Sequence, residues 1–527
     1  MKRKLVVLLT AVLIFASFAY GVLKKEQSKT SDDSSGTQKK QDPVEISIAY
    51  WDIETALANG ENDKMLKKVQ DDLNIKLDPM NTTWDDYKQK IQLWATSSQL
   101  PDLFAIDVVG SSFYYKWIDE EVVKPLPNDL SKYPLLEEYL KTPDVAALKV
   151  NNKFYTIPRR TWPDVKMSGT ERGIVYRWDL AQKAGITKEP ETYDELRAMI
   201  LAIIKNNTEG KNIAGLTAVQ TQLIDGVLFP YSLPLAMSDG SGNDYKWVKK
   251  DGKYVPAYFA GDALATFQLA RDMYKEGTIE KDIALTKSQQ AYDKFVQGQS
   301  AGIIMNTQAF NIETYLGRPW AKVYPDKPFH ECVKLCYPLK AKDGNTYGAV
   351  FKTYWSESYI STDDPVKMDA ILRMADYYLK KENKDMLRNG FEGEDYTVSG
   401  DGIFVRKEGV VLLEKYPFSN TSGLFEFDNT YNVLNLTGNE EYDKYVSMVM
   451  AYYDKVKKTT LPEYNPAHTN ISTPLKNAFV IKPAEDLLTI MTGKDPVEKM
   501  YKDLMDNYER KGLSKMIDEV NKVISSN

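Results

Sequence analysis

The chain contains only two histidines, His330 and His468, and only two cysteines, Cys332 and Cys336. His330 and the two cysteines lie close enough in sequence to suggest a metal site. Tetrahedral zinc needs four ligands, however, and only three are in view. A disulfide between cysteines four residues apart is geometrically awkward. We therefore expect free thiols, no bound metal and no histidine-based catalytic triad.

Motifs for nucleotide or acyl chemistry are missing from the sequence. There is no P-loop, no Gly-x-Gly-x-x-Gly opening a helix and no Gly-x-Ser-x-Gly elbow, so we expect no cofactor. A net charge of -6 argues against nucleic acid as a partner. Paired carboxylates remain open, because the 74 acidic residues offer many pairs and glycosidases use such pairs as acid and base.

Aromatic side chains are the unusual feature of the composition. They make up 12% of the residues, and 34 of them are Tyr. Tyr and Trp combine a flat apolar face with a polar group, which suits ligands that have both apolar faces and hydroxyls. Most of these aromatics must nevertheless belong to the core of so large an α/β chain.

The N-terminal segment predicts export. Three basic residues precede an uncharged apolar stretch from Leu5 to Leu23, which is typical of a signal peptide. The stretch is also about long enough to cross a bilayer, so residues 1–23 are either a cleaved signal peptide or a retained signal anchor. Residues 24–43 are polar and read as a flexible tether. We expect the protein outside the cytoplasm, at the outer face of the membrane or secreted.

Strands and helices alternate along the rest of the chain. Val44, Ile46 and Ile48 alternate with polar residues and predict a strand, 62–73 a helix and 75–77 a second strand, which together form a βαβ unit. Further strands are expected at 103–109, 174–176 and 302–305. Helices are expected after Thr192, where a capping box lies, over 259–276, and after Pro365 and Pro496. The predicted class is α/β.

Five segments, in the same order, resemble the extracellular solute-binding proteins of ABC importers, and specifically the large Gram-positive, oligosaccharide-binding branch. The segments are 100–103 (Leu-Pro-Asp-Leu), 152–158 (Asn-Lys-Phe-Tyr-Thr-Ile-Pro), 175–196 (beginning Val-Tyr-Arg-Trp-Asp-Leu), 295–302 (Phe-Val-Gln-Gly-Gln-Ser-Ala-Gly) and 390–397 (Gly-Phe-Glu-Gly-Glu-Asp-Tyr-Thr). That branch normally carries a lipidated cysteine after the signal, and this chain has none there. Members of the family often carry an Asp-rich loop that resembles a calcium-binding loop near the position of residues 206–212. In this chain the segment 206–212 holds a single carboxylate, which is too few for a Ca²⁺ site.

The resemblance implies a two-lobed periplasmic-binding-protein fold of type II, with the ligand in a cleft between lobes that are joined by hinge crossovers. It further implies closure of the lobes around the ligand. In the implied division, residues 44–158 form the first part of the N-lobe and residues 159–355 belong mainly to the C-lobe. The chain returns to the N-lobe over 356–390, and the C-terminal part, 391–527, completes the C-lobe.

With a sugar as ligand, the site needs aromatic rings beside carboxylates, amides or Arg. Candidates follow the strand ends or lie near the expected crossovers, where α/β clefts bind ligands. The nine candidates are Trp51, Asp52, Asp107, Arg159, Trp162, Tyr231, Asn306, Gln308 and Trp355. For each aromatic among them, a packed core position is the competing interpretation, and for Glu392 in the last motif a structural role is favoured.

The function implied is capture of an oligosaccharide outside the cell and its delivery to the transmembrane subunits of an ABC permease. No chemistry is expected, and the protein should act as a monomer, attached to the membrane only if residues 1–23 are retained. Three alternatives stay open: a secreted glycoside hydrolase or lyase, a binding protein for another solute such as a peptide or an iron chelate, and a sensor or adhesin that uses the same fold.

Overall fold

The structure is a computed structural model that describes residues 42–162, 165–206, 212–233, 245–336, 338–348, 352–400, 402–427, 439–460 and 463–526. Residues 43–527 form one compact unit. The predicted signal segment and all but the end of the predicted tether lie outside the described residues, as does most of the loop at 206–212. Within the described ranges, no helix is long and apolar enough to span a membrane.

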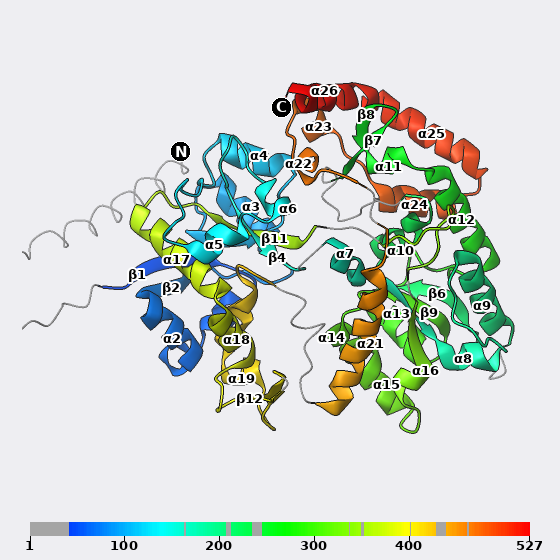
Figure 1. The fold of residues 1–527 in the computed structure, drawn as a ribbon, viewed down its shortest axis with the longest axis horizontal. Helices are drawn as coiled ribbons and strands as arrows, with labels where there is room; N and C mark the ends of the chain where they lie inside the picture. Colours follow the sequence, from blue (N-terminus) through cyan, green and yellow to red (C-terminus); the bar gives the residue numbers. More distant parts are fainter. Residues whose placement is uncertain are drawn as a thin grey trace, which may run out of the picture. The chain divides into compact units, whose positions relative to one another are not determined.

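The first lobe is built on a five-stranded sheet with the order β2-β1-β3-β11-β4 (Figure 1). Its strands are β1 (Val44–Ala49), β2 (Ile75–Pro79), β3 (Leu103–Ile106), β4 (Ile157–Arg160) and β11 (Tyr354–Ile360). Strand β1 pairs in parallel with β2 and β3, whereas β11 lies between β3 and β4 and runs antiparallel to both. The carboxyl ends of β1 and β3 therefore lie at the same edge of the sheet as the start of β11.

The predicted βαβ unit is confirmed as β1, α2 (Lys64–Leu73) and β2. The buried Asp63 caps α2 by accepting the backbone N–H groups of Met65 and Leu66, which explains where the helix begins. Asn74, at a left-handed φ of 50°, ends it. Helices α2, α3 (Tyr87–Thr96) and α17 (Pro365–Leu379) pack against the strands and cover the core.

The second lobe is built on a four-stranded sheet with the order β10-β5-β9-β6. The strands are β10 (Val333–Cys336), β5 (Gly173–Arg177), β9 (Ser300–Met305) and β6 (Ala214–Ala218); β5 is antiparallel to β9 and β10, and β6 is parallel to β9. The predicted capping box is confirmed: Thr192 and Glu195 bond each other's backbone at the start of α9 (Tyr193–Lys205). The helix predicted over 259–276 is divided at Gly261 and Asp262 into α11 (Ala257–Ala260) and α12 (Ala263–Glu276), and the helix predicted after Pro496 is confirmed as α25 (Val497–Arg510).

The remaining elements complete the two lobes. The first lobe adds α1 (Ile53–Leu57), α4 (Ser112–Asp119), α5 (Pro134–Tyr139), α6 (Pro143–Ala146), α18 (Lys381–Asn389), α19 (Leu412–Lys415) and the hairpin β12 (Tyr396–Val398)–β13 (Phe404–Arg406). The second lobe adds α7 (Val165–Ser168), α8 (Trp178–Lys183), α10 (Ile224–Leu228), α11 (Ala257–Ala260), α12 (Ala263–Glu276), α13 (Ser288–Val296), α14 (Ala309–Ile312), α15 (Arg318–Val323), α16 (Phe329–Cys332), α21 (Glu440–Val456), α22 (Pro466–Thr469), α23 (Pro474–Ala478), α24 (Pro483–Thr492), α25 (Val497–Arg510), α26 (Leu513–Ser526) and the hairpin β7 (Trp247–Lys250)–β8 (Lys253–Pro256).

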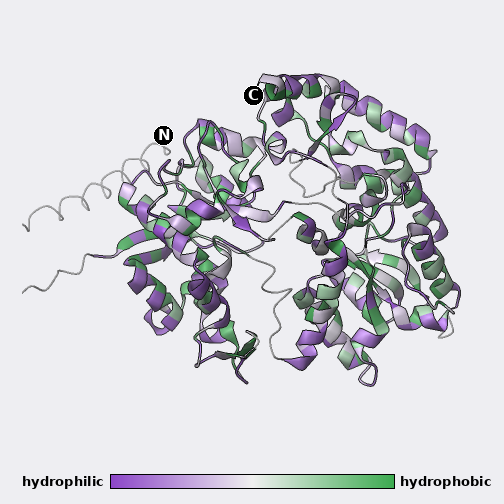
Figure 2. Cartoon of the chain, in the orientation of Figure 1, coloured by the Kyte–Doolittle hydropathy of each residue, from purple (hydrophilic) through white to green (hydrophobic). Residues whose placement is uncertain are grey.

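Each sheet has its own hydrophobic core, which confirms the predicted two-lobed α/β fold. Figure 2 shows the outer helices with apolar and polar residues alternating along their length, as amphipathic helices do. The segment 391–427 contributes Leu412, Tyr416, Phe418, Leu424 and Phe425 to the first core, although the sequence places it with the second lobe. Strands β4 and β11, at the predicted lobe boundaries, both belong to the first sheet.

Candidate ligand-binding site

Four aromatic side chains meet at the edge of the first sheet where β1 ends and β11 begins. We call Trp51, Trp84, Trp355 and Phe427 the aromatic wall. The ring centroids of Trp51, Trp84 and Trp355 are mutually 5.6 Å apart, and Phe427 lies 6.0 Å from Trp355. The contact between Trp51 and Trp355 joins residues more than 300 positions apart in sequence, because β11 returns beside β3.

Exposure differs sharply within the aromatic wall. Trp51 is 9% exposed and Trp355 is partly buried, but Trp84 is 54% exposed. Tyr87, at the start of α3, packs behind the wall with its ring 5.6 Å from Trp51 and 5.7 Å from Trp84. The wall therefore combines a buried, fixed base with one Trp whose face is open to solvent.

Arg159 lies within the wall and is fully buried. Its guanidinium carbon is 4.5 Å from the Trp51 ring and 5.5 Å from the Trp355 ring, a cation–π arrangement. The guanidinium donates to the Gly423 carbonyl (2.5 Å), the Ser356 hydroxyl (2.6 Å) and the Tyr50 hydroxyl (3.0 Å). Burial lowers the pKa of this guanidinium from its usual value. These bonds hold the ends of β1, β4 and β11 and the segment before Phe427 in place.

Carboxylates flank the wall. Asp107, directly after β3, accepts from the Lys88 ammonium at 2.9 Å and from the Tyr87 hydroxyl at 3.4 Å, with its side chain 28% exposed. Asp52 is exposed at the start of α1, in a left-handed conformation with φ of 60°. The structure thus gathers Trp51, Arg159 and Trp355 by direct contact and joins Asp107 to them through Tyr87.

The remaining four predicted site residues lie beyond β4, with the second lobe. Asn306 accepts the backbone N–H of Gln308 at 3.1 Å, just after β9, and Gln308 is 8% exposed. Tyr231 packs edge-on against Tyr193 at 5.1 Å. Trp162 is 1% exposed in the second-lobe core and donates its indole N–H to Glu171 at 2.8 Å.

Sequence reasoning missed Trp84, Tyr87 and Phe427. Trp84 and Tyr87 flank two aspartates in the segment 84–87, which lies between the second strand and α3, and this aromatic–carboxylate pattern was a usable signal. Phe427 had none, because its approach to Trp355 depends on long-range packing of the segment 391–427.

Two of the segments that join the lobes lie side by side. The backbone N–H groups of Thr161 and Trp162 both donate to the carbonyl of Thr353, at 2.7 and 2.8 Å. Beside them the buried carboxylate of Glu426 pairs with Arg160 and, at 2.7 Å, with Lys384. Paired crossing strands anchored at one end are suited to a hinge.

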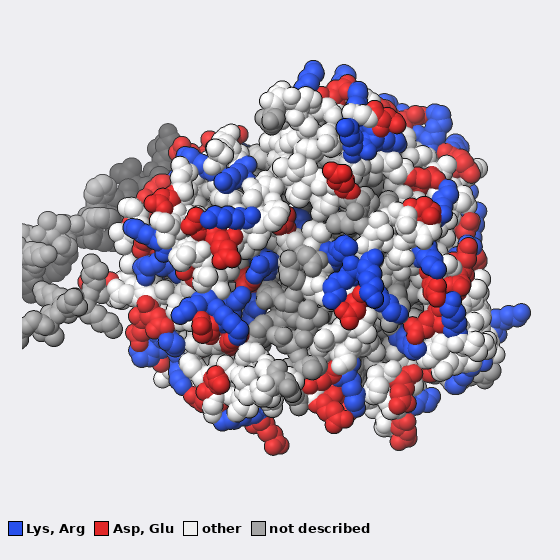
Figure 3. Space-filling model, in the orientation of Figure 1, with Lys and Arg blue, Asp and Glu red and all other residues white. Residues whose placement is uncertain are grey.

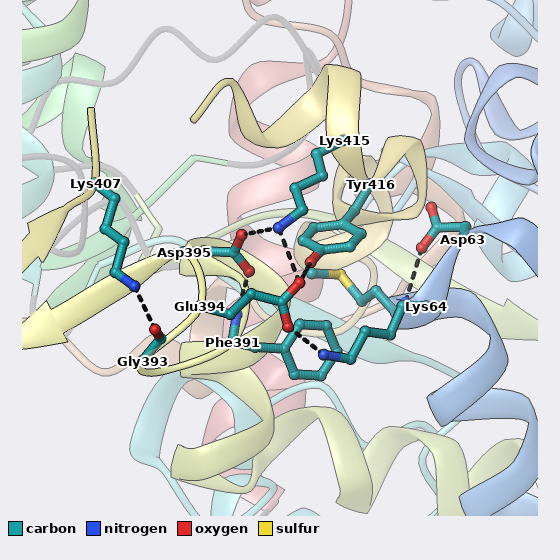
Figure 4. Close-up of polar contacts among 10 residues, drawn as sticks. Asp63, Lys64, Phe391, Gly393, Glu394, Asp395, Lys407, Lys415 and Tyr416 are labelled. Carbon is teal, nitrogen blue, oxygen red and sulfur yellow. Dashed lines mark hydrogen bonds and ion pairs between the residues drawn. The ribbon is translucent and has the colours of Figure 1, made fainter. Parts of the chain in front are cut away.

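The motif at 390–397 serves as a structural joint (Figure 4). Asp395 accepts the Phe391 N–H at 2.7 Å and pairs with Lys415 at 2.5 Å. Glu394 pairs with Lys64 of α2 and, at 2.9 Å, with Lys415. Hydrogen bonding to Lys64 and Lys415 lowers the pKa of the Glu394 carboxyl to about 2. These bonds tie the segment 391–416 to α2 of the first lobe.

Neither cysteine is paired, and burial raises the pKa of the Cys336 thiol to about 12. Across the described ranges, no group of three or more His, Cys, Asp or Glu side chains is placed to hold a metal ion.

A groove of about 760 Å³ lies between β10 and α21, lined among others by Glu189, Lys334 and Met448. Figure 3 shows charges of both signs interspersed over the visible face.

The sequence of residues 59–333 matches the family described as bacterial extracellular solute-binding proteins, and the chain belongs to this family. It is 21% identical over 416 residues to the polygalacturonan/rhamnogalacturonan-binding protein YtcQ of Bacillus subtilis, covering 76% of this chain and 77% of that one. It is 23% identical over 550 residues to the lipoprotein LipO of Bacillus subtilis, covering 100% and 99%.

Solved structures share the fold. The substrate-binding protein FusA of the S. pneumoniae ABC transporter, in complex with kestose, has a TM-score of 0.65 at 15% identity, covering 92% of this chain and 99% of that one. The alginate-binding protein AlgQ2 has a TM-score of 0.64 at 17% identity, with 92% of this chain and 98% of that one covered.

Family membership makes this chain the extracytoplasmic, non-catalytic solute-binding protein of an ABC transporter.

Proposed function

We propose that the solute is a carbohydrate, an oligosaccharide, and that it binds on the aromatic wall. The observation that carries this proposal is the exposed Trp84 set against Trp51 and Trp355. Sugar rings present C–H faces that stack on aromatic rings, and a second ring edge-on to the first gives a ligand two surfaces to contact. Asp107 supplies carboxylate oxygens beside the wall for sugar hydroxyls.

Capture then depends on closure of the second lobe over the wall. Asn306 and Gln308 follow β9 and supply amides for further hydroxyls, and Asp52 and Tyr231 contribute at the rim. The paired backbone bonds at Thr353 act as the hinge. The closed monomer delivers the sugar to the transmembrane subunits of the permease. The names of YtcQ and of the FusA complex, both relatives with carbohydrate ligands, support this choice of solute.

Thermal unfolding of residues 43–527 against a panel of plant and bacterial oligosaccharides tests the proposal. A ligand present at 100 times its Kd adds about 2.7 kcal/mol to the free energy of unfolding, which is a readily measured shift. We expect a shift with at least one oligosaccharide, recovered intact afterwards. A shift with peptides or iron chelates and none with sugars would refute the carbohydrate assignment, and recovery of cleaved sugar would contradict the non-catalytic role.

A further inference from the structure

Glu357 is a fully buried carboxylate two positions after Trp355 in β11. One of its oxygens, Oε2, accepts the backbone N–H groups of Val108 and Val109 at 3.2 and 3.4 Å and the Tyr359 hydroxyl at 2.9 Å. The two N–H groups belong to the segment that follows β3 and begins with Asp107. Glu357 therefore holds the backbone that presents Asp107 beside the aromatic wall.

The other oxygen, Oε1, is buried and has no hydrogen-bond partner among the described residues. The hydroxyl of Tyr114 in α4 is buried and unpartnered in the same way, and its ring lies 6.2 Å from that of Tyr359. A buried carboxylate with one satisfied and one unsatisfied oxygen is costly to ionise, because water cannot solvate the charge.

Charged and titratable groups from every neighbouring element act on Glu357. They are Asp107 after β3, Lys352 before β11, Arg159 in β4, Tyr87 in α3, Tyr114 in α4 and Tyr359 in β11. Burial is the largest effect and raises the pKa of Glu357 to about 7; Asp107 raises it as well, whereas Lys352 lowers it. The carboxyl consequently changes charge close to neutral pH.

We propose that Glu357 is a positioning residue of the aromatic wall and that its protonation controls how tightly the wall binds sugar. This inference rests on the proposed function. Glu357 does not touch the ligand; it acts through Val108 and Val109, which place Asp107, and Asp107 in turn holds Tyr87 behind Trp51.

The direction of the pH effect follows from linkage. A sugar seated on the wall removes water from around Asp107 and its neighbours, which disfavours the charged form of Glu357 still further and raises its pKa in the complex. Binding is therefore tighter when Glu357 is protonated. Since one unit of pKa difference between free and bound protein corresponds to about tenfold in affinity, we expect a loss of roughly three- to tenfold between pH 6 and pH 8.

Two variants and one control test the proposal. Glu357→Gln keeps an acceptor oxygen but cannot ionise, and Glu357→Leu removes the acceptor. Glu280→Gln is the control, because Glu280 is a buried carboxylate of the second lobe that accepts from Thr217 at 2.7 Å and Lys294 at 2.8 Å. Affinity for the oligosaccharide from the thermal screen is measured from pH 5.5 to 8.5, and amide hydrogen exchange at Val108 and Val109 is followed without ligand.

The unchanged chain and Glu280→Gln should lose affinity as the pH rises, whereas Glu357→Gln should give a flat profile. Exchange at Val108 and Val109 should stay slow in Glu357→Gln and become fast in Glu357→Leu. A pH profile that persists in Glu357→Gln, or slow exchange in Glu357→Leu, would overturn the inference. If the unchanged chain binds no sugar at any pH, the proposed function is refuted, and with it the control of sugar binding by Glu357. The exchange data would still decide whether Glu357 positions the backbone of Val108 and Val109.

Discussion

Replacing Trp84 with alanine should weaken sugar binding without weakening the fold. Trp84 is 54% exposed, so of ~250 Å² for a whole Trp side chain about 135 Å² faces solvent. A sugar ring that covers half of this surface removes roughly 70 Å² from water, which at ~25 cal/mol per Å² corresponds to about 1.7 kcal/mol. The Kd should rise about 15- to 20-fold.

Isothermal titration with the oligosaccharide found in the thermal screen measures this change, and urea denaturation measures the fold. Leu93→Ala is the matched control, because Leu93 is 64% exposed on α3, the helix that carries Tyr87. We expect both variants to unfold within about 0.5 kcal/mol of the unchanged chain. A Kd for Trp84→Ala within twofold of the control would refute the reasoning, because a ligand on the wall must cover its one exposed Trp.

Three further predictions concern stability. Burial raises the pKa of the Glu357 carboxyl from 4.5 to about 7, so the folded state holds the proton more tightly than the unfolded state does. The contribution of Glu357 to the free energy of unfolding is therefore largest below pH 4.5 and falls by about 3 kcal/mol as the pH rises through 7. Glu357→Gln should remove this pH dependence, measured by urea denaturation at a series of pH values. Arg159→Lys loses most of the three guanidinium bonds and should lower the free energy of unfolding by about 2–4 kcal/mol, measured in the same way. Asp395→Asn breaks the pair with Lys415 and should cost about 1–3 kcal/mol while leaving the Kd for the oligosaccharide unchanged by titration.

Local signals in the sequence predicted the fold well. Alternating apolar residues from Val44 to Ile48, the capping box at Thr192 and the proline that begins α17 each act within a few residues, and each produced the expected element. The order of motifs then indicated the family and, with it, two lobes. These features depend on backbone preferences and side-chain periodicity, which a single sequence displays directly.

The site was harder to predict because it is assembled from distant segments. Trp51 was predicted from its position at the end of a strand and Trp355 from its position near an expected crossover, but their contact with each other requires β11 to insert between β3 and β4. Arg159 was expected to bond ligand hydroxyls, and its burial within the wall depends on Gly423, more than 260 residues away. Side chains that meet only through such packing leave no local pattern to read.

The packing of 391–427 shows the same limit at the scale of a lobe. The ion pairs of Glu394 with Lys64 in α2 and of Glu426 with Arg160 in β4 attach this segment to the first lobe. Neither pair is close in sequence, and both involve charged residues that a hydropathy pattern reads as surface. Chain order alone therefore led to the prediction that these residues, as part of 391–527, complete the second lobe.

The most direct test of the central claim is a crystal structure of residues 43–527 with the oligosaccharide identified by the thermal screen. We predict a sugar ring stacked on Trp84, a neighbouring ring or edge against Trp355, and a hydroxyl bonded to Asp107. A sugar bound elsewhere, for example in the groove between β10 and α21, with Trp84 left open to solvent, would contradict the account.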